Sequence, residues 1–507
     1  MTSEEFKEWT KNLWYFDKDK DQGFEGILCA SNNAKKDTHP APYPEDLIER
    51  LLKIYSYKND LVLDPFNGTG TSTLVASKLN RQFIGIELSK SYCLVALQRL
   101  NAIKKPSNLY SFDKDVSKLI NSEKIADSLN EIFPYKEAFS PYLLEFLKQK
   151  FKCKIASVFD PFCGVGSSFL SKETKCCFGF DTNPFAINVS LAKLTPLNSK
   201  KIKQALKLLE NFNQDFVSPF ALPKWQPFEK YANKEKFSLI MSLMEHFKGF
   251  DKELYHFVKY TLLSNLDKML DYKKDGNGIK YRKSKIKELI LYMKELLCRA
   301  FELKSAFDKE NTKEINLQNT SSLAKSLDIR VDCVLTSPPY ANLFDYFEVY
   351  KMELWSSGII KDYAQWKSLK KSALRNNKNA NLNTNDFIKN ELLQKALEKL
   401  QDKNLDKSTI TMLKNYFYDM KIILQKCFEL LKNDGFCFIV VANSCYKGVP
   451  IKTDEILARE AEKIGFKLKE LIIARKINTS AQQMKTLDNL TKFYLRESII
   501  VLQKDKL

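Results

Sequence analysis

The stretch ASVFDPFCGVG at residues 156–166 joins a short apolar run to a loop with two glycines. Such a run predicts a buried strand, and glycines let the backbone approach a ligand without a Cβ in the way. Asp181 follows Asp160 by 21 residues (181 − 160 = 21), at the end of a second apolar run. A carboxylate at that place can accept hydrogen bonds from both ribose hydroxyls of a nucleoside cofactor. The stretch therefore predicts a strand–loop unit that binds a nucleoside.

The same unit occurs once more, nearer the start of the chain. The loop DPFNGTG at 64–70 follows another apolar run, and Glu87 lies 23 residues after Asp64 (87 − 64 = 23). The two copies are a duplicated supersecondary unit and not a short-period solenoid. A lone GxG would be an ordinary tight turn. The preceding strand, the later acid and the second copy together favour a nucleoside site.

Apolar strands alternate with helical patterns, including a helix expected after each loop, which predicts a parallel sheet with crossover helices. We therefore expect an α/β fold: a Rossmann-like sheet with helices on both faces, mostly helical insertions, and an N-terminal partial α/β unit. The expected limits are 1–115 for the partial unit, with a third strand near 109–112, then 116–131 for a polar linker and 132–507 for the complete domain, which carries insertions at 197–325 and 361–405.

The overall composition narrows the range of functions. Hydrophobic residues make up 44% of the 507 residues, which is enough for a sizeable core. Lys and Arg total 81 against 62 Asp and Glu; this net charge of +19 indicates either a lysine-rich surface or a polyanionic partner. Three histidines offer little material for a metal site, and none of the eleven cysteines forms a CxxC pair. The polar start and the lack of a long apolar run predict a cytoplasmic protein with no membrane segment.

A third element, TSPPY at 336–340, directly follows the apolar stretch at 332–335. Two successive prolines stiffen the backbone and remove two amide donors. The carbonyl oxygens there suit hydrogen bonds from an amino group, and the ring of Tyr340 can stack on a flat base. Alone, this motif would be a strand-ending turn with a buried tyrosine. Beside two DPFxGxG loops, it predicts a catalytic segment.

These motifs together resemble the signature of the amino-methylating DNA methyltransferases, the N4-cytosine and N6-adenine enzymes. The resemblance covers nearly the whole of 132–507. Besides the two motifs, it is carried by FPYKEAFSPYLLEFL at 133–147, GFDTNPFAI at 179–187, TSPPYANLFDYFEVYKMELW at 336–355, VVANSCYKGVPIKTDEIL at 440–457 and LRESIIVL at 495–502. The resemblance implies a Rossmann-like methyltransferase sheet, S-adenosylmethionine as cofactor and double-stranded DNA as partner.

Carried over position by position, the resemblance implies two groups of site residues. The residues expected to bind or shape the place of the cofactor are Asp160, Phe162, Gly164, Gly166, Asp181, Phe133, Tyr135 and Phe139. The expected catalytic residues are Ser337, Pro338, Pro339 and Tyr340, where Ser337 and the Pro338 carbonyl hold the target amino group and Tyr340 stacks on the extruded base. Family members often have an acidic residue where this chain has Asn319, which is the candidate contact to the adenine amino group of the cofactor.

Basic residues in the first insertion are candidates for DNA binding. They surround Tyr281 and are Lys273, Lys274, Lys280, Arg282, Lys283 and Lys285. Cationic side chains there would hold phosphates, and a few would contact base edges. A solvated lysine-rich surface explains the same residues equally well. The second insertion offers Lys370, Lys371 and Arg375 as weaker candidates.

The front of the chain, residues 1–112, resembles only the C-terminal half of a permuted family member. EEFKEWTKNLWYF, HPAPYPEDLIERLL and the first loop carry this likeness, with Asp64, Phe66, Gly68, Gly70 and Glu87 as a possible second cofactor loop. No PPY segment occurs in 1–131. Three hypotheses follow: the half-unit packs on the second domain, it pairs with a chain that supplies the missing half, or it is the remnant of a gene fusion or frame interruption.

We therefore expect a site-specific DNA methyltransferase of a restriction-modification system, with N4 of cytosine as the target because TSPPY and not DPPY is present. The alternatives are an N6-adenine DNA methyltransferase, an RNA methyltransferase and a non-catalytic DNA-specificity subunit. A cognate restriction endonuclease is an expected partner. No metal is required for this chemistry.

Overall fold

The computed structural model describes most of the chain. The described residues are Thr10, 44–89, 92–93, 95–97, 99–100, 110–120, 128–135, 138–225, 228–276, 278–309, 313–382, 387–477, Leu487 and 489–505. Apart from Thr10, the segment EEFKEWTKNLWYF lies outside them, as does the start of HPAPYPED. The chain divides into two compact units, Met1–Tyr110 and Ser111–Leu507. None of the described helices combines the length and the apolarity needed to cross a membrane.

The first unit is a small strand–helix repeat. Its elements are α3 (Glu45–Tyr55), β1 (Leu61–Asp64), α4 (Thr71–Lys78) and β2 (Gln82–Gly85). The two strands pair in parallel, with Val62 opposite Phe83. Helix α4 contacts both strands and α3 contacts α4. The apolar runs at 60–63 and 83–87 predict two strands here, and both are confirmed within about one residue of their predicted start.

The strand expected near 109–112 does not belong to the first unit. It is β3 (Tyr110–Phe112), which lies beside β13 in the sheet of the second unit. Asp113 then caps α6 (Lys114–Leu119), and Val116 and Ile120 are buried in the core of the second unit. The described start of the expected linker at 116–131 is therefore part of a packed domain, because its apolar side chains have a core to enter.

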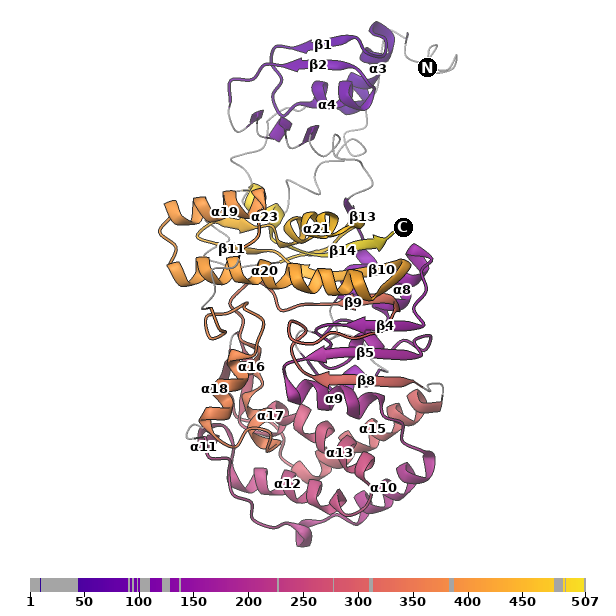
Figure 1. Cartoon of the computed structure of the whole chain (residues 1–507), viewed down its shortest axis with the longest axis vertical. Helices are drawn as coiled ribbons and strands as arrows, with labels where there is room; N and C mark the ends of the chain where they lie inside the picture. The colour runs from indigo at the N-terminus through magenta and orange to yellow at the C-terminus, as the bar shows by residue number, and fades with distance from the viewer. Residues whose placement is uncertain are drawn as a thin grey trace. The chain divides into compact units, whose positions relative to one another are not determined.

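The second unit contains an eight-stranded mixed sheet, seen in Figure 1 as strands stacked one above another. In sheet order the strands are β3, β13 (Phe466–Lys476), β14 (Arg496–Lys504), β10 (Leu431–Ala442), β9 (Val331–Thr336), β4 (Ser157–Asp160), β5 (Cys176–Asp181) and β8 (Glu314–Asn319). The strands from β10 to β8 are parallel, and β14 is antiparallel to both of its neighbours. The carboxyl ends of β4, β5 and β9 therefore meet at one edge, where parallel sheets bind ligands.

Helices cover both faces of this sheet, which confirms the expected fold class. Alternate residues of β10 point to opposite faces: Phe436 and Phe438 join one core with the ring of Phe151 from α8 (Leu143–Phe151). Cys437 faces the other way, toward Cys427 of α20 (Lys407–Leu430). Helix α21 (Thr453–Ile464) packs on that second face with α20.

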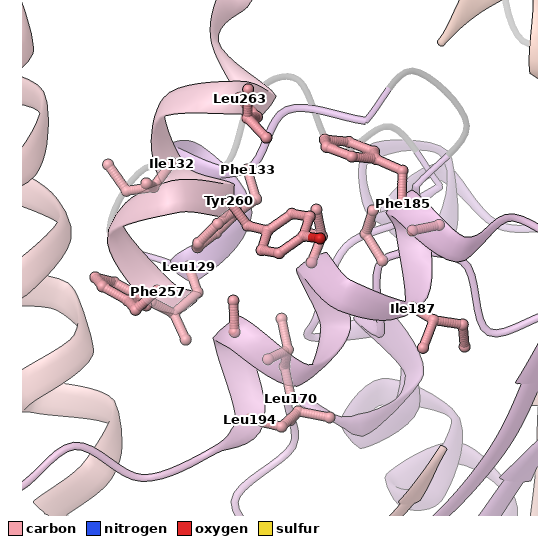
Figure 2. Packing of buried hydrophobic residues seen from close by; sticks show 14 of the residues in the cluster. Leu129, Ile132, Phe133, Leu170, Phe185, Ile187, Leu194, Phe257, Tyr260 and Leu263 are labelled. Carbon is pink, nitrogen blue, oxygen red and sulfur yellow. The ribbon is translucent and has the colours of Figure 1, made fainter. Parts of the chain in front are cut away.

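The first insertion is mostly helical, as expected, and shares a core with the sheet domain. Its elements are α10 (Ser199–Asn211), η3 (Gln214–Phe216), α11 (Phe228–Tyr231), α12 (Lys234–Lys248), α13 (Lys252–Ser264), α14 (Leu266–Met269), β6 (Tyr272–Asp275), β7 (Gly278–Tyr281) and α15 (Leu289–Lys309). Figure 2 shows Phe257 and Tyr260 of α13 among side chains from α7 (Leu129–Ile132) and α9 (Pro184–Leu194). The expected limit at residue 325 is wrong, because β8 within it is a strand of the main sheet.

The remaining elements lie on either side of the second insertion. They are α16 (Tyr346–Val349), α17 (Lys351–Ser356), α18 (Tyr363–Lys371), α19 (Glu391–Asp402), β11 (Ser444–Tyr446), β12 (Val449–Ile451) and α23 (Asn489–Tyr494). The helix expected after the second glycine loop is only a 3-10 turn, η2 (Ser167–Phe169).

Candidate active site

The glycine loop after β4 is held by two carboxylates. The backbone N–H of Phe162 donates to Asp160 Oδ1 at 3.0 Å, and that of Gly164 donates to Asp181 Oδ2 at 2.9 Å. A Cβ on Gly164 would meet no atom closer than 3.9 Å, so the missing side chain leaves open space above the loop. A Cβ on Gly166 would lie 3.0 Å from Ser190 Oγ, so this second glycine serves close packing on α9.

Asp160 connects the loop to the strand that carries the catalytic segment. The Thr336 hydroxyl donates to its Oδ1 at 2.6 Å, and the Ser168 hydroxyl donates to its Oδ2. Burial, with a smaller contribution from the charge of Asp181, raises the pKa of Asp160 to about 6. Because Thr336 directly precedes Ser337, these bonds fix the distance between the two motifs.

Asp181 ends β5 with its carboxylate turned to the loop. Its Oδ1 accepts from the backbone N–H of Asn183 at 2.7 Å, and burial raises its pKa to about 6. Each oxygen keeps a lone pair for a further donor. The side chain can therefore take two hydroxyl groups of a ribose while it holds the loop.

The catalytic segment is anchored at its tyrosine. The Tyr340 hydroxyl donates to Glu497 Oε1 at 2.5 Å, and Arg475 Nε donates to Glu497 Oε2 at 2.5 Å. Burial, followed by the Glu497 charge, raises the pKa of Tyr340 well above its usual value. The phenol thus stays neutral, and β14 determines where its ring can lie.

Two side chains from later segments hold the backbone after Tyr340. The Asn376 amide donates to the carbonyl of Phe344 at 2.9 Å and more weakly to that of Tyr340 at 3.3 Å. The Tyr446 hydroxyl donates to the carbonyl of Ala341 at 2.8 Å. The segment is therefore fixed from outside, in keeping with its lack of regular secondary structure.

One cavity brings the loop and the catalytic segment together. Counted with its open mouth it has a volume of about 960 Å³, near the upper end of small-molecule sites at about 300–1,000 Å³. Of the predicted residues it is lined by Tyr135, Phe139, Asp160, Phe162, Gly164, Asp181, Ser337 and Pro339. Residues that the motifs did not indicate also line it: 320–323, Tyr346, Phe347, Asn376 and Asn377. The run of asparagines in the second insertion was the one available signal for the last two.

Five predicted residues lie outside the cavity lining, and one of them is Tyr340, whose hydroxyl bonds to Glu497. Phe133 is 1% exposed and packs edge-on against Phe257 in the core (Figure 2), so its expected role in the pocket is wrong. Pro338 is buried and Gly166 faces α9. The Asn319 amide donates to the backbone carbonyl of Asp181 at 2.9 Å, so this amide positions the acid and does not face the cavity.

Comparison with known proteins shows which family the start of the chain matches and which enzymes the chain is similar to. The model of the DNA methylase family of N6- and N4-enzymes matches residues 2–98. The type II methyltransferase M.AvaI, from Nostoc sp. and from Anabaena variabilis, is 27% identical over 425 residues, covering 73% of this chain and 86% of the relative. The type II methyltransferase M.BglII of Bacillus subtilis is 40% identical over 97 residues, 19% of this chain and 27% of the relative.

Residues 2–98 match this family, and the chain is similar over most of its length to an amino-methylating DNA methyltransferase that uses S-adenosylmethionine. Among solved structures, TrmN from Thermus thermophilus aligns with 91% of this methyltransferase and 78% of its own chain, at 10% identity and a TM-score of 0.24. That likeness is too low to support an inference.

A buried lysine that the motifs did not indicate lies under the glycine loop of the methyltransferase. Lys193 Nζ donates to the Val165 carbonyl and to Asn130 Oδ1, both at 2.7 Å. The Asn130 amide in turn donates a hydrogen bond to Ser167 Oγ at 3.1 Å. Burial lowers the pKa of Lys193 to about 7. The loop is thereby tied to α9.

The basic candidates of the first insertion fall into two groups. Lys280, Arg282, Lys283 and Lys285 are exposed and Lys273 is half-buried. Lys274 forms a 2.8 Å ion pair with Glu353, which has no exposed surface, so its expected contact with DNA is wrong. The positive charge of Lys274 is therefore used inside the protein, by the buried carboxylate of Glu353.

The candidates of the second insertion are mostly engaged inside the methyltransferase. Lys370 bonds to Glu348 at 2.6 Å and to Asp345 at 3.0 Å. Two nitrogens of the Arg375 guanidinium donate hydrogen bonds to the carboxylate of Asp419 on α20. Both cations hold the insertion on the domain, and Lys371 alone is exposed.

The first glycine loop has the same local bonds as the second. The backbone N–H of Phe66 donates to Asp64 Oδ1 at 3.0 Å, and that of Gly68 to Glu87 Oε2 at 2.8 Å. Gly70 has a φ of 83°, which its counterpart Gly166 matches at 76°. The predicted second loop is thus formed, whereas a catalytic segment beside it is absent from the described residues of the first unit.

Proposed function

We propose that this methyltransferase transfers a methyl group from S-adenosylmethionine to the exocyclic amino group of a base in duplex DNA, N4 of cytosine, in a type II restriction-modification system. One observation carries the proposal: residues 160–165 of the loop line the same cavity as Ser337 and Pro339, with Thr336 bonded to Asp160 at their junction. The described cysteines form no disulfide, which agrees, together with the DNA substrate, with a cytoplasmic enzyme.

The residues of the cavity fit a nucleoside cofactor. Asp181 has acceptor capacity left for ribose hydroxyls, and Gly164 leaves room for a ligand to lie on the loop. Tyr135, Phe139 and Phe162 offer apolar surface around it. When bound, S-adenosylmethionine supplies an electrophilic methyl group.

The catalytic segment would act by holding the target amino group. Ser337 and the Pro338 carbonyl accept its hydrogens, which turns the nitrogen lone pair toward the cofactor side of the cavity. These bonds strengthen as positive charge develops on nitrogen, so they favour the transition state over the ground state. Tyr340 stacks on a base that has left the duplex, and its bond to Glu497 keeps the ring in place beforehand. Such positioning can supply about 7–11 kcal/mol of the barrier.

The choice of cytosine N4 rests on Thr336 and Ser337 in place of an acidic residue at the start of the motif. The type II assignment, with a cognate restriction endonuclease as partner, follows the names of M.AvaI and M.BglII. Methyl transfer from labelled cofactor to bacterial duplex DNA, followed by nucleoside digestion and mass analysis, tests both points. N4-methylcytosine supports the proposal, and N6-methyladenine corrects the base.

Two other outcomes would replace this function. Label in transfer RNA and none in DNA would make the protein an RNA methyltransferase. Binding of cofactor and DNA without transfer, unchanged by Ser337→Ala, would make it a non-catalytic DNA-specificity subunit.

We also propose that the first unit pairs with a chain that supplies the strands and the PPY segment missing from it. Support comes from the exposed side chains Leu61, Leu63, Ile84 and Ile86 along β1 and the end of β2. In the second unit the strand equivalent to β1 has a parallel neighbour on each side. Coexpression with a separate PPY-containing half is the test: a stable stoichiometric complex supports the partner, and a monomeric chain at equal expression opposes it.

A further inference from the structure

The β6–β7 hairpin in the first insertion has two unlike faces. Residues opposite each other in an antiparallel pair lie on the same face, and the faces alternate along each strand. Tyr272, Lys274 and Ile279 therefore share one face, and Lys273 and Lys280 share the other. The first face is turned to the protein, because Tyr272 is fully buried and Ile279 packs on the core.

The inward face is bound to α17, the second helix after the predicted catalytic segment. The Tyr272 hydroxyl donates to Glu353 Oε1 at 3.1 Å, and Lys274 Nζ lies 2.8 Å from the same oxygen. Glu353 belongs to α17 and has no exposed surface. The hairpin thus places a cation beside a buried carboxylate only thirteen residues after Tyr340 (353 − 340 = 13).

Lys274 also begins a line of contacts that ends at the cavity. Its Nζ lies 4.4 Å from the ring centroid of Tyr350. The Tyr350 ring stacks on Tyr135 with centroids 4.4 Å apart and planes at 7°. Tyr135 lines the cavity, and its Cε1 is the nearest side-chain atom to the open position above Gly164. The hairpin and the glycine loop are therefore joined through two rings.

The outward face carries positive charge into solvent. Lys280 is 69% exposed and forms an ion pair with Asp275 in the same hairpin. Arg282, Lys283 and Lys285 follow directly and are exposed. A projecting strand pair with cations on its free side suits the phosphates of a duplex, which are spaced along an edge and need no base-specific partner.

We propose that the hairpin is a DNA-backbone contact whose inward residue, Lys274, is a positioning residue for the cofactor cavity. The inference rests on the proposed DNA substrate. Lys273 and Lys280 bind phosphates, and Lys274 holds Tyr350 against Tyr135. Because coupling between two binding sites is reciprocal, duplex DNA and cofactor each tighten the binding of the other.

The test measures this coupling in the full chain with S-adenosylhomocysteine as the cofactor probe. Calorimetry gives its Kd alone and with a duplex fragment of bacterial DNA. For the natural sequence, we expect DNA to lower the Kd about fivefold or more. The double variant Lys274→Met, Glu353→Gln removes both charges, so no buried ion is left unpaired. Its DNA affinity should stay, and the Kd ratio should fall to about one.

Lys280→Met is the matched control on the outward face of the same hairpin. We expect weaker DNA binding and a slope of log affinity against log salt that is shallower by about one, with an unchanged Kd for the probe alone. A full Kd ratio in the double variant would refute the role of Lys274. An unchanged salt slope for Lys280→Met would refute the phosphate contact.

Two further measurements keep the result unambiguous. If the double variant loses its thermal transition, Lys274→Gln with Glu353→Gln takes its place, since it also removes both charges but keeps polar side chains, and its Kd ratio should likewise fall to about one. Methyl transfer to DNA is measured on the same natural protein. Transfer without coupling overturns this inference alone, and coupling without transfer overturns the proposed function alone.

Discussion

The glycine loops at 64–70 and 160–166 have the same local bonds in unlike surroundings. In each, a Phe N–H bonds to the first Asp at 3.0 Å, and a Gly N–H bonds to an acid at the end of the next strand. Phe66 is 87% exposed, whereas Phe162 lines the cavity. Thr336 bonds to Asp160, and among the described residues no hydroxyl bonds to Asp64. The loop conformation is thus determined by nearby residues. A cofactor and substrate site also requires the neighbouring strand that carries the predicted catalytic segment.

The likeness extends to a cation twelve residues after each acid (193 − 181 = 12; 99 − 87 = 12). Lys193 donates to the carbonyl between the two glycines of its loop at 2.7 Å, and Arg99 donates to the equivalent Thr69 carbonyl at 3.0 Å. Both side chains are buried. The cation therefore belongs to the construction of the loop, whether or not catalysis takes place beside it.

Substitution of the acid that bonds to each loop, Asp181 or Glu87, should give the largest difference between the two loops in methyl transfer. Asp181→Ala deletes an ionised acceptor of two ribose hydroxyls, and bonds to charged groups contribute about 1.5–3 kcal/mol each. Methyl transfer should therefore fall about 100-fold or more, whereas Glu87→Ala should change it less than twofold. Steady-state transfer rates give both values. A cofactor stoichiometry that drops from two to one in Glu87→Ala would show that the first loop binds cofactor as well.

Substitution by alanine of the residue before each loop aspartate tests how completely that strand side chain is buried in solution. Phe159 is 2% exposed and Leu63 is 58% exposed. Phe159→Ala should lower the free energy of unfolding by about 3–5 kcal/mol, and Leu63→Ala by about 0.5 kcal/mol or less. Urea unfolding followed by circular dichroism provides the comparison. A loss above about 1 kcal/mol for Leu63→Ala would mean that this face is covered in solution.

The buried cations should give intermediate effects, each confined to its own unit. Lys193→Met leaves the Val165 carbonyl without this donor, at a cost of about 1–3 kcal/mol. Arg99→Met should cost a similar amount. Hydrogen exchange with peptide resolution checks the assignment: Lys193→Met should weaken protection in 157–194, and Arg99→Met in 61–85. Loss of protection in both units from one substitution would contradict separate loops.

The smallest effect is a dependence on pH that belongs to the second loop. Burial raises the pKa of Asp160 and Asp181 to about 6. A raised pKa favours the protonated folded form, so the unfolding free energy of the cofactor-free protein should fall as pH rises from about 4 through 6. Cofactor binding has the opposite sign, because Asp181 must be ionised to accept two hydroxyls. The Kd of S-adenosylhomocysteine should fall several-fold from pH 5 to 7, and Asp181→Asn should flatten that change.

Local patterns predicted most of the second unit. The pattern at 453–464 predicts a helix, which is α21 with the same limits, and the run at 330–335 predicts a strand, which is β9 at Val331–Thr336. The motifs also led to the carboxylates and to Ser337, because turns and strand ends are defined by neighbours in sequence. The placement of their roles on this chain stays a prediction until it is measured.

What local patterns could not predict depends on distant contacts. Lys274 looked like its basic neighbours, and only the position of Glu353 made it an internal residue. Asn376 reaches the cavity because Arg375 is fixed to α20, 44 residues further on (419 − 375 = 44). Strand β3 at 110–112 lies next to β13 at the edge of the main sheet. No sequence pattern within the first unit indicates this pairing.

The position of β14 has a consequence for how the protein is made. It comes last in sequence among the described strands, yet it lies between β13 and β10, and its Glu497 holds the Tyr340 hydroxyl. On the ribosome, β13 emerges with no partner to pair with on its inner side until residues 496–504 follow. The sheet can be closed and the tyrosine set only after residues 496–504 have left the ribosome. The nascent chain should therefore carry every cavity residue and still be unable to methylate the DNA of its own cell.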